Sequence, residues 1–202
     1  MLTSFFFDLR FYEFAGYLRN FDFGLIHSMK PPPTDLSFPG IETGDFRKVG
    51  EMAKLIWPVA YGALISDAQI NFMIGRMYDP VTIQREIKKE GIRYHWIFEK
   101  SERIGFLAFG PLAKAASCTL HKLYLLPERQ GRGAGSTALR WITSQTKQVG
   151  ASAIHLRVNR GNRDAIRCYE GNGFKITGED CLEIGEGFVM DDYLMRKDLE
   201  AR

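Results

Sequence analysis

The amino-acid sequence predicts an α+β fold of the mixed α/β kind, in which helices and strands share one domain. Stretches with the two-residue period of strands alternate along the chain with stretches of helical period. Two strand patterns, 94–98 and 104–109, are separated by the turn at 101–103 and indicate a hairpin. A further strand at 118–126 leads through a glycine-rich loop into a helix at 136–149.

The helices before the hairpin have clear start and stop signals. A strand is expected near residues 36–41, and a first helix follows from 46 to 57. The second helix begins at a capping box, in which Ser66 and Gln69 each satisfy an unpaired backbone donor. The third begins at Asp79, followed by proline at the first helical position, and ends at Gly91.

The second half of the chain repeats the alternation. A strand pattern covers 153–158, a helical pattern covers 163–170, and two final strands cover 175–184 and 188–196. The predicted order is therefore strand, helices, three strands, helix, strand, helix and two strands.

Composition indicates a globular chain and excludes several classes of function. The chain has 202 residues, enough for one sizeable core. Its 27 basic and 24 acidic residues give a net charge of +3, too small to indicate a nucleic-acid or membrane partner. Three cysteines without metal spacing predict reduced thiols, a cytoplasmic location and no bound metal.

Residues 1–35 differ from the rest and are expected to be an N-terminal extension of a domain covering 36–202. Nine of the 26 aromatic residues fall within 1–28, where acidic residues argue against a signal peptide. Two alternatives stay open. The segment is an amphipathic helix that packs on the domain or on a second subunit of a homodimer, or it is a poorly ordered extension. Three prolines at 31–33 indicate a linker.

The loop before helix 136–149 has the properties of an anion site. Gly131, Gly133 and Gly135 fall within five positions, directly before the helix start. The first N–H groups of a helix lack intrahelical partners, and the helix dipole adds positive potential there. Arg129 and Arg132 are expected to add formal charge. The loop is therefore predicted to hold a pyrophosphate.

Several kinds of loop fit that description. A P-loop is excluded because no Gly-Lys-Ser/Thr follows. Gly133, Gly135 and Ala138 satisfy the dinucleotide fingerprint, which also requires an acidic residue about twenty positions on. The next acid after Glu128 is Asp164, which is too far. Two alternatives stay open for this loop. It is part of a dinucleotide site in a nicotinamide-dependent enzyme, or it is a turn that only joins a strand to a helix.

Two sequence blocks resemble one family. Gln130-Gly-Arg-Gly-Ala-Gly135 resembles the Q/R-x-x-G-x-G/A signature of the GNAT (Gcn5-related N-acetyltransferase) superfamily. Residues 162–174 resemble that family's N-x-x-A-x-x-x-Y-x-x-x-G-F, at the expected spacing. The resemblance covers roughly residues 36–199. It implies a mixed, mostly antiparallel central sheet flanked by helices, in the order β-α-α-β-β-β-α-β-α-β-β.

The resemblance also implies acetyl transfer from acetyl-CoA, the co-substrate, to a primary amine by direct attack. The pantetheine arm would lie against the backbone of Leu123, Tyr124 and Leu125. Asn162 would contact the cofactor, or would only cap the following helix. The backbone amides expected to hold the pyrophosphate are those of Gln130, Gly131, Arg132, Gly133, Ala134, Gly135 and Ser136.

The catalytic residues are less determined by the sequence. Tyr169 occupies the family's tyrosine position and is expected to protonate the leaving thiolate; the alternative is a core side chain. The central strand carries no acid, and strand alternation would place Thr119, His121, Leu123 and Leu125 on one face. His121 is therefore the candidate base, with an ordinary pKa near 6.5. A hydrogen-bonded structural histidine and a water chain remain alternatives.

The acceptor is expected between the first two helices and the last two strands, and it would be a small-molecule or peptide amine. This part of the chain is loosely similar to PaiA-type small-amine or polyamine acetyltransferases. A non-catalytic acyl-CoA-binding sensor or interaction module of GNAT fold is the alternative function. The expected aromatic walls are Trp57, Tyr61, Tyr78 and Trp96, and the expected acids are Asp67, Asp79, Glu186, Asp191 and Asp192.

Overall fold

The structure, a computed structural model, describes residues 35–112 and 117–200. The chain divides into two units, Met1–Lys30 and Pro31–Arg202, and every described residue belongs to the second. The expectations for residues 1–34 lie outside the described residues.

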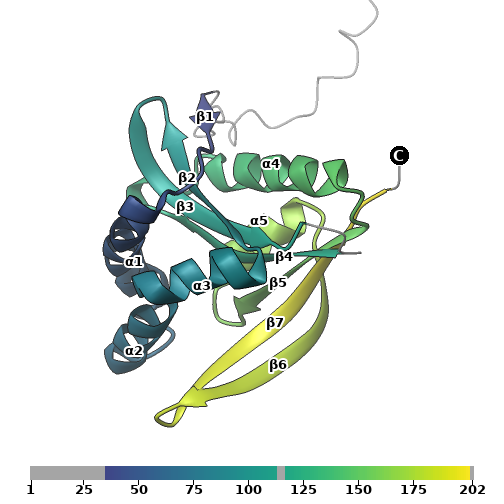
Figure 1. Cartoon of the computed structure of the whole chain (residues 1–202). Coiled ribbons are helices and arrows are strands. Elements are labelled where there is room, and N and C mark those ends of the chain that lie inside the picture. Colours follow the sequence, from purple (N-terminus) through teal and green to yellow (C-terminus); the bar gives the residue numbers. More distant parts are fainter. Residues whose placement is uncertain (1–34, 113–116, 201–202) are drawn as a thin grey trace, which may run out of the picture. The chain divides into compact units, whose positions relative to one another are not determined.

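The described chain forms one seven-stranded sheet in the order β1-β2-β3-β4-β5-β7-β6 (Figure 1). Neighbouring strands are antiparallel except β4 and β5, which run parallel. The predicted mixed, mostly antiparallel sheet is thereby confirmed. The strands are β1 (Leu36–Ser37), β2 (Arg93–Glu99), β3 (Glu102–Gly110), β4 (Ser117–Leu125), β5 (Ala153–Asn159), β6 (Lys175–Gly185) and β7 (Phe188–Asp198).

The starts of α2 and α3 follow local chemistry, but two expectations are wrong. The first helix continues through Pro58 to Tyr61 instead of ending at residue 57, and the Gln69 side chain donates to the Val189 carbonyl on β7 instead of completing the capping box. Ser66 accepts a hydrogen bond from the Gln69 amide, and Asp79 accepts one from the Val81 amide. The family resemblance implied two helices between β1 and β2, but the structure has three, because Asp79-Pro80 starts a third. The helices are α1 (Phe46–Tyr61), α2 (Asp67–Met77), α3 (Pro80–Glu90), α4 (Ala134–Gln148) and α5 (Arg163–Gly171), with the 3₁₀ turns η2 (Thr43–Asp45) and η3 (Pro127–Arg129).

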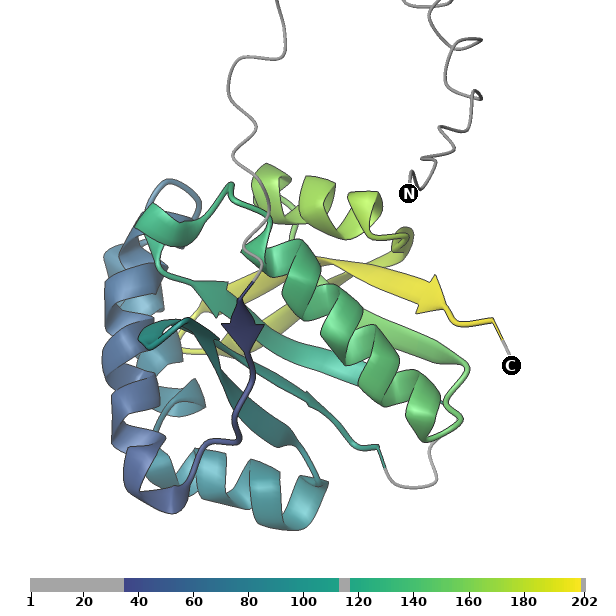
Figure 2. The same cartoon turned by 90° about the horizontal axis from the view of Figure 1, so that it is seen from above.

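The sheet separates two apolar cores. Along β3, Phe106 and Ala108 pack with α1, α2 and α3, while Leu107 and Phe109 pack with α4 and α5. This alternation follows from the two-residue period of a strand. Figures 1 and 2 show α1, α2 and α3 grouped together, with α4 and α5 on the other side of the sheet.

A β-bulge interrupts β4 at His121. Leu107 pairs with Leu123 and Ala108 with Lys122, but Phe109 pairs with Leu120. One extra residue on a strand turns the following side chains to the opposite face. The expectation that His121 shares a face with Leu123 is therefore wrong.

The parallel strands β4 and β5 part before they end. Their pairing runs from Ser117 with Ala153 to Leu120 with Leu156. Beyond it, β4 stays paired with β3, and β5 stays paired with β7 as far as Asn159. One edge of each strand is thus left open in the middle of the sheet.

Candidate functional site

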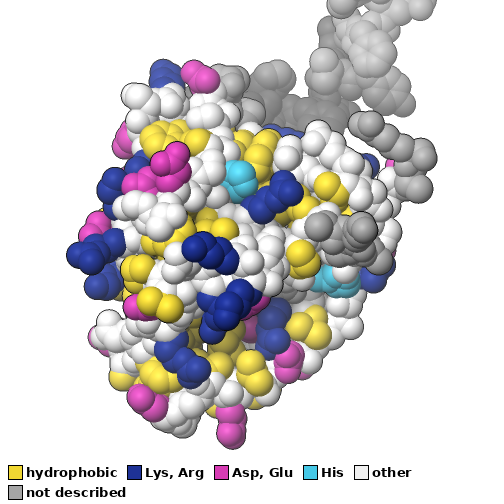
Figure 3. Space-filling view, in the orientation of Figure 1, with side chains coloured by type: hydrophobic (Ala, Val, Ile, Leu, Met, Phe, Trp, Pro, Cys, Tyr) yellow, Lys and Arg dark blue, Asp and Glu magenta, His cyan; other side chains and the backbone are white. Residues whose placement is uncertain are grey.

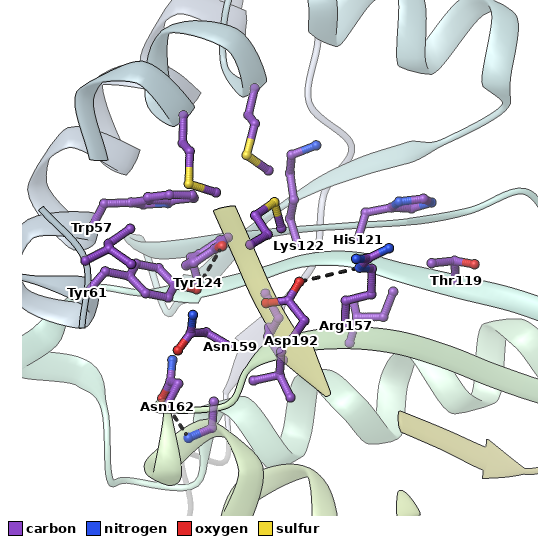
Figure 4. Close-up of a pocket in the computed structure, with 18 of the residues that line it drawn as sticks. Trp57, Tyr61, Thr119, His121, Lys122, Tyr124, Arg157, Asn159, Asn162 and Asp192 are labelled. Carbon is purple, nitrogen blue, oxygen red and sulfur yellow. Dashed lines mark hydrogen bonds and ion pairs between the residues drawn. The ribbon is translucent and has the colours of Figure 1, made fainter. Parts of the chain in front are cut away.

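A cavity of about 290 Å³ lies where β4 and β5 part. Its walls come from α1, α2, α3, β4, β5, α5 and β7 (Figure 4). Elements far apart in sequence therefore converge on one space.

The glycine-rich loop leads into α4 beside this gap. Gly133 is the N-cap of α4 with φ +83°, and no described side chain caps that helix start. Gly131 has φ +70° and open space where a Cβ would stand. The first described hydrogen bond of the helix is from the Thr137 amide to the Gly133 carbonyl. The amides of residues 134–136 therefore precede the regular ladder, as an anion site requires.

Two side chains hold this loop in place. The Arg129 guanidinium pairs with Glu99 at 3.1 Å and with Glu102, so its charge is neutralised there. The expected contribution of Arg129 to the anion site is not supported. Gln130 donates from Nε2 to the Leu125 carbonyl at 2.9 Å, which ties the loop to the end of β4.

The predicted cofactor-binding strand lies at the gap. Leu123 and Tyr124 line the cavity, and Leu125 is the last residue of β4. Asn162 lines it too, and its Oδ1 accepts from the Ala165 amide at 3.1 Å. The capping role of Asn162 is confirmed, and cofactor contact stays a prediction.

Tyr169 joins a group of tyrosines at the cavity. It packs against Phe174 with ring centroids 5.7 Å apart, and the Tyr61 and Tyr124 hydroxyls lie 3.3 Å apart. Burial raises the pKa of Tyr169, and Tyr61 adds to the rise. The phenol therefore stays protonated at neutral pH, the form that a proton donor requires.

His121 also lines the cavity, as an exposed bulge residue. Its Nε2 lies 3.3 Å from the Gly110 carbonyl. Desolvation of the ring lowers the pKa of His121, and the charge of Lys122 adds to this. Its role as a base stays a prediction.

Two ion pairs in the cavity wall are absent from the sequence-based expectations. Lys122, only 4% exposed, contacts Glu86 at 2.8 Å, and Glu86 also accepts from the Tyr94 hydroxyl. Asp192, 3% exposed, accepts from Arg157 at 3.4 Å. No local sequence signal indicates such pairs, because their members come from different elements.

The acceptor side differs in part from expectation. Trp57 and Tyr61 line the cavity, but Tyr78 is buried behind them and accepts a hydrogen bond from Trp57 Nε1. Trp96 is likewise buried and donates to Asp45. Of the five expected acids, Asp192 lines the cavity. The apolar residues that complete the wall are Ile65, Met73, Met77, Val189 and Met190.

The described residues show neither a membrane helix nor a metal-binding group. Among them, no helix is both long and apolar enough to cross a bilayer. No three His, Cys, Asp or Glu side chains in the described ranges come together as metal ligands would. Lys and Arg side chains are interspersed with acidic and apolar ones on the face in Figure 3. That face therefore lacks the continuous basic stripe typical of nucleic-acid binding.

Comparison with known proteins gives consistent matches. Residues 57–174 match the sequence model of the acetyltransferase (GNAT) family. An uncharacterized N-acetyltransferase of Mycobacterium tuberculosis is 36% identical over 80 residues, 40% of this chain and 51% of that protein. The chain thus spans about half the length of the curated relatives it matches.

Solved structures share the fold. The PaiA N-acetyltransferase of Thermoplasma acidophilum, solved with coenzyme A, has a TM-score of 0.68 and 25% identity, over 82% of this chain and 99% of that one. The ribosomal-protein-S18-alanine N-acetyltransferase of Escherichia coli has a TM-score of 0.61 and 15% identity, over 83% and 96%. At 15% identity, the similarity to the Escherichia coli enzyme shows a shared fold only.

Proposed function

Since the chain belongs to the acetyltransferase (GNAT) family, we propose that it transfers an acetyl group from acetyl-CoA to a primary amine by direct attack. The observation that carries this proposal is the uncapped start of α4, which lies beside a parted strand pair and a cavity lined by Tyr169.

The chain's backbone would hold acetyl-CoA. Amides of residues 130–136 would bind the pyrophosphate, and the open edge of β4 at 123–125 would pair with the pantetheine arm. The open space at Gly131 and the uncapped helix start support this assignment. The PaiA relative, solved with coenzyme A, also supports it.

The chemistry needs a donor to the thioester oxygen, a proton for the thiolate and a neutral amine. A backbone N–H near Leu125 would polarise the carbonyl. Tyr169, a phenol that is protonated at neutral pH, would give its proton to the departing sulfur. Asn162 would contact the co-substrate from the start of α5. His121, in the cavity wall, is one candidate base.

The acceptor would be a small-molecule or peptide amine, with polyamines among the candidates. The cavity, about 290 Å³ in volume, supports a small acceptor. Its apolar lining opposite a buried carboxylate supports an acceptor with a cationic head. Solved relatives include PaiA and a spermidine N-acetyltransferase chimera, the latter at an identity that carries the fold alone.

The test combines binding and turnover. Acetyl-CoA is titrated by calorimetry, and released thiol is followed with hexylamine, spermidine, an aminoglycoside, an amino acid and a peptide with a free N-terminus. Binding with thiol release is expected. Binding without release for any amine would favour the sensor function, and absence of binding would overturn the proposal.

Tyr169→Phe separates the enzyme from the sensor. We expect kcat to fall about 10²- to 10⁴-fold, because the thiolate loses its proton donor. The Kd for acetyl-CoA should change by less than about twofold, because the ring remains. Tyr193→Phe, on β7, is the matched control and should leave kcat unchanged. A Tyr169→Phe enzyme with normal kcat would remove the general acid from the mechanism.

A further inference from the structure

Asp192 is the buried acid of the cavity. It is 3% exposed, and it is the one acidic side chain among the buried polar residues of the described ranges. Figure 4 shows it between Arg157 and Asn159, in the space beyond the parting of β4 and β5. Asp192 pairs with Asn159 across β7 and β5, which places it past the last β4–β5 pair.

The charge of Asp192 is only partly compensated. Arg157 Nε lies 3.4 Å from Asp192, while Nη2 of the same guanidinium lies 2.6 Å from Asp180. The Arg157 guanidinium therefore lies closer to Asp180, the more exposed of the two acids, than to Asp192. A buried carboxylate with a distant, shared partner is costly unless a further cation reaches it.

The other two candidate proton acceptors in the cavity wall, Glu86 and His121, already have partners. Glu86 is bound by Lys122 at 2.8 Å and by the Tyr94 hydroxyl. His121 stands on the bulge with Nε2 at the Gly110 carbonyl. Asp192 is thus the cavity carboxylate with capacity left for a ligand.

Its surroundings suit an ammonium group on an apolar body. Apolar side chains of α2 and β7, among them Met73, Met77 and Met190, line the same cavity. Tyr61 faces it from α1: burial raises the pKa of Tyr61, and the negative charge of Asp192 adds to the rise. The two side chains are therefore electrostatically coupled across the space.

We propose that Asp192 binds the ammonium group of the acceptor and takes its first proton, so that the enzyme acts on alkyl or polyamine-type primary amines. The proposal rests on the proposed function. The ammonium gives one proton to the Asp192 carboxylate, which passes it to solvent. The nitrogen–carbon bond forms and the carbon–sulfur bond breaks, the nitrogen loses a second proton, and Tyr169 protonates the sulfur. The second proton restores Tyr169, so one proton is released per turnover.

The charged groups around Asp192 agree with this role. Burial raises the pKa of Asp192, Arg157 on β5 opposes the rise, and Asp191 and Asp180 add to it. A raised pKa makes the carboxylate a better proton acceptor than an exposed aspartate.

Asp192→Asn keeps the shape and removes the charge, and Asp198→Asn, at an exposed acid farther along β7, is the matched control. We expect kcat/KM for hexylamine and spermidine to fall at least about 100-fold in Asp192→Asn. The Kd for acetyl-CoA should stay within about twofold. Asp198→Asn should behave as the unmodified enzyme. A loss under threefold in Asp192→Asn, or a large loss in His121→Asn in its place, would overturn the proposal.

A binding measurement covers the case in which Asp192→Asn does not fold. Calorimetry with the unmodified protein and coenzyme A compares hexylamine with 1-hexanol at pH 7. We expect hexylamine to bind at least about tenfold more tightly; equal binding would overturn the ammonium site. If the unmodified enzyme acetylates none of the amines tested, the proposed function fails, and this comparison still decides the ammonium site.

Discussion

Two buried charged side chains, Lys122 and Asp192, line the cavity, and their charges are compensated to different extents. Lys122 has Glu86 at 2.8 Å, and its ammonium lies 5.0 Å from the Tyr94 ring centroid. Asp192 has a shared guanidinium at 3.4 Å. Removing one member of a buried pair typically costs about 3–5 kcal/mol. The charge of Lys122 is therefore compensated in place, while Asp192 keeps an unfavourable charge that a substrate cation would relieve.

Asp192→Asn is expected to raise stability near neutral pH. Because burial raises the folded-state pKa of Asp192 above its unfolded value, folding favours the protonated acid. That contribution is fully present below the unfolded pKa and is lost as pH rises through the folded pKa. The neutral amide should therefore gain stability relative to aspartate as pH increases from 4 to 8.

Urea unfolding at pH 4, 6 and 8 measures this difference, with Asp198→Asn as the control. A variant that becomes less stable relative to the unmodified protein as pH rises would show that the Arg157 pair outweighs burial.

At the scale of the elements, the site depends on three local irregularities. β4 and β5 stop pairing after Leu120, the bulge at His121 turns the following side chains, and α4 starts without a side-chain cap. Each leaves backbone groups without regular partners. Functional sites commonly use such irregular backbone, because regular ladders leave no donors for a ligand.

Gly131 and Gly150 lie just beyond opposite ends of α4 and form a matched pair. Both have left-handed φ, +70° and +77°, with nothing within 4 Å of an added Cβ. Alanine at either position should cost stability by a similar amount, about 1–2 kcal/mol. Only Gly131→Ala should weaken acetyl-CoA binding, by about tenfold. The added methyl group would reduce the open space in the loop that is proposed to bind pyrophosphate.

Calorimetry and thermal unfolding of both variants test this prediction. Equal affinities in the two variants would argue against phosphate binding at residues 130–136.

At the scale of the whole molecule, the cavity combines elements from both halves of the described chain. Its walls combine α1 and α2 from the first half with β5, α5 and β7 from the second. The sheet runs without a break from β1 to β6, and the two cores fill its opposite faces. All described residues of the site lie within the second unit, Pro31–Arg202. The homodimer remains a prediction.

Removal of residues 1–30 should leave the acetyltransferase domain intact. Because residues 1–30 form a separate unit, the melting temperature of the second unit should shift by less than about 4 °C, corresponding to under about 1 kcal/mol. The Kd for acetyl-CoA should be unchanged. A shortened chain that fails to fold or to bind would show that the N-terminal segment belongs to the domain.

The sequence alone predicted what depends on neighbouring residues. The starts of α2 and α3 follow from Ser66 and Asp79, whose side chains bond amides two or three positions away. The glycine loop and the Asn162 cap are equally local. The family motif then indicated the strand order, because it identifies a fold as well as a site.

Only the tertiary structure decided which side chains meet in the cavity. The alternation that placed His121 beside Leu123 failed at a bulge, which depends on the partner strand β3. Tyr78 and Trp96 are aromatic in sequence but lie behind the wall. Asp192 was one of five candidate acids, and burial beside the parted strands singled it out. Caps and turns are set by contacts a few residues apart, whereas burial and charge pairing are set by elements brought together from the whole chain.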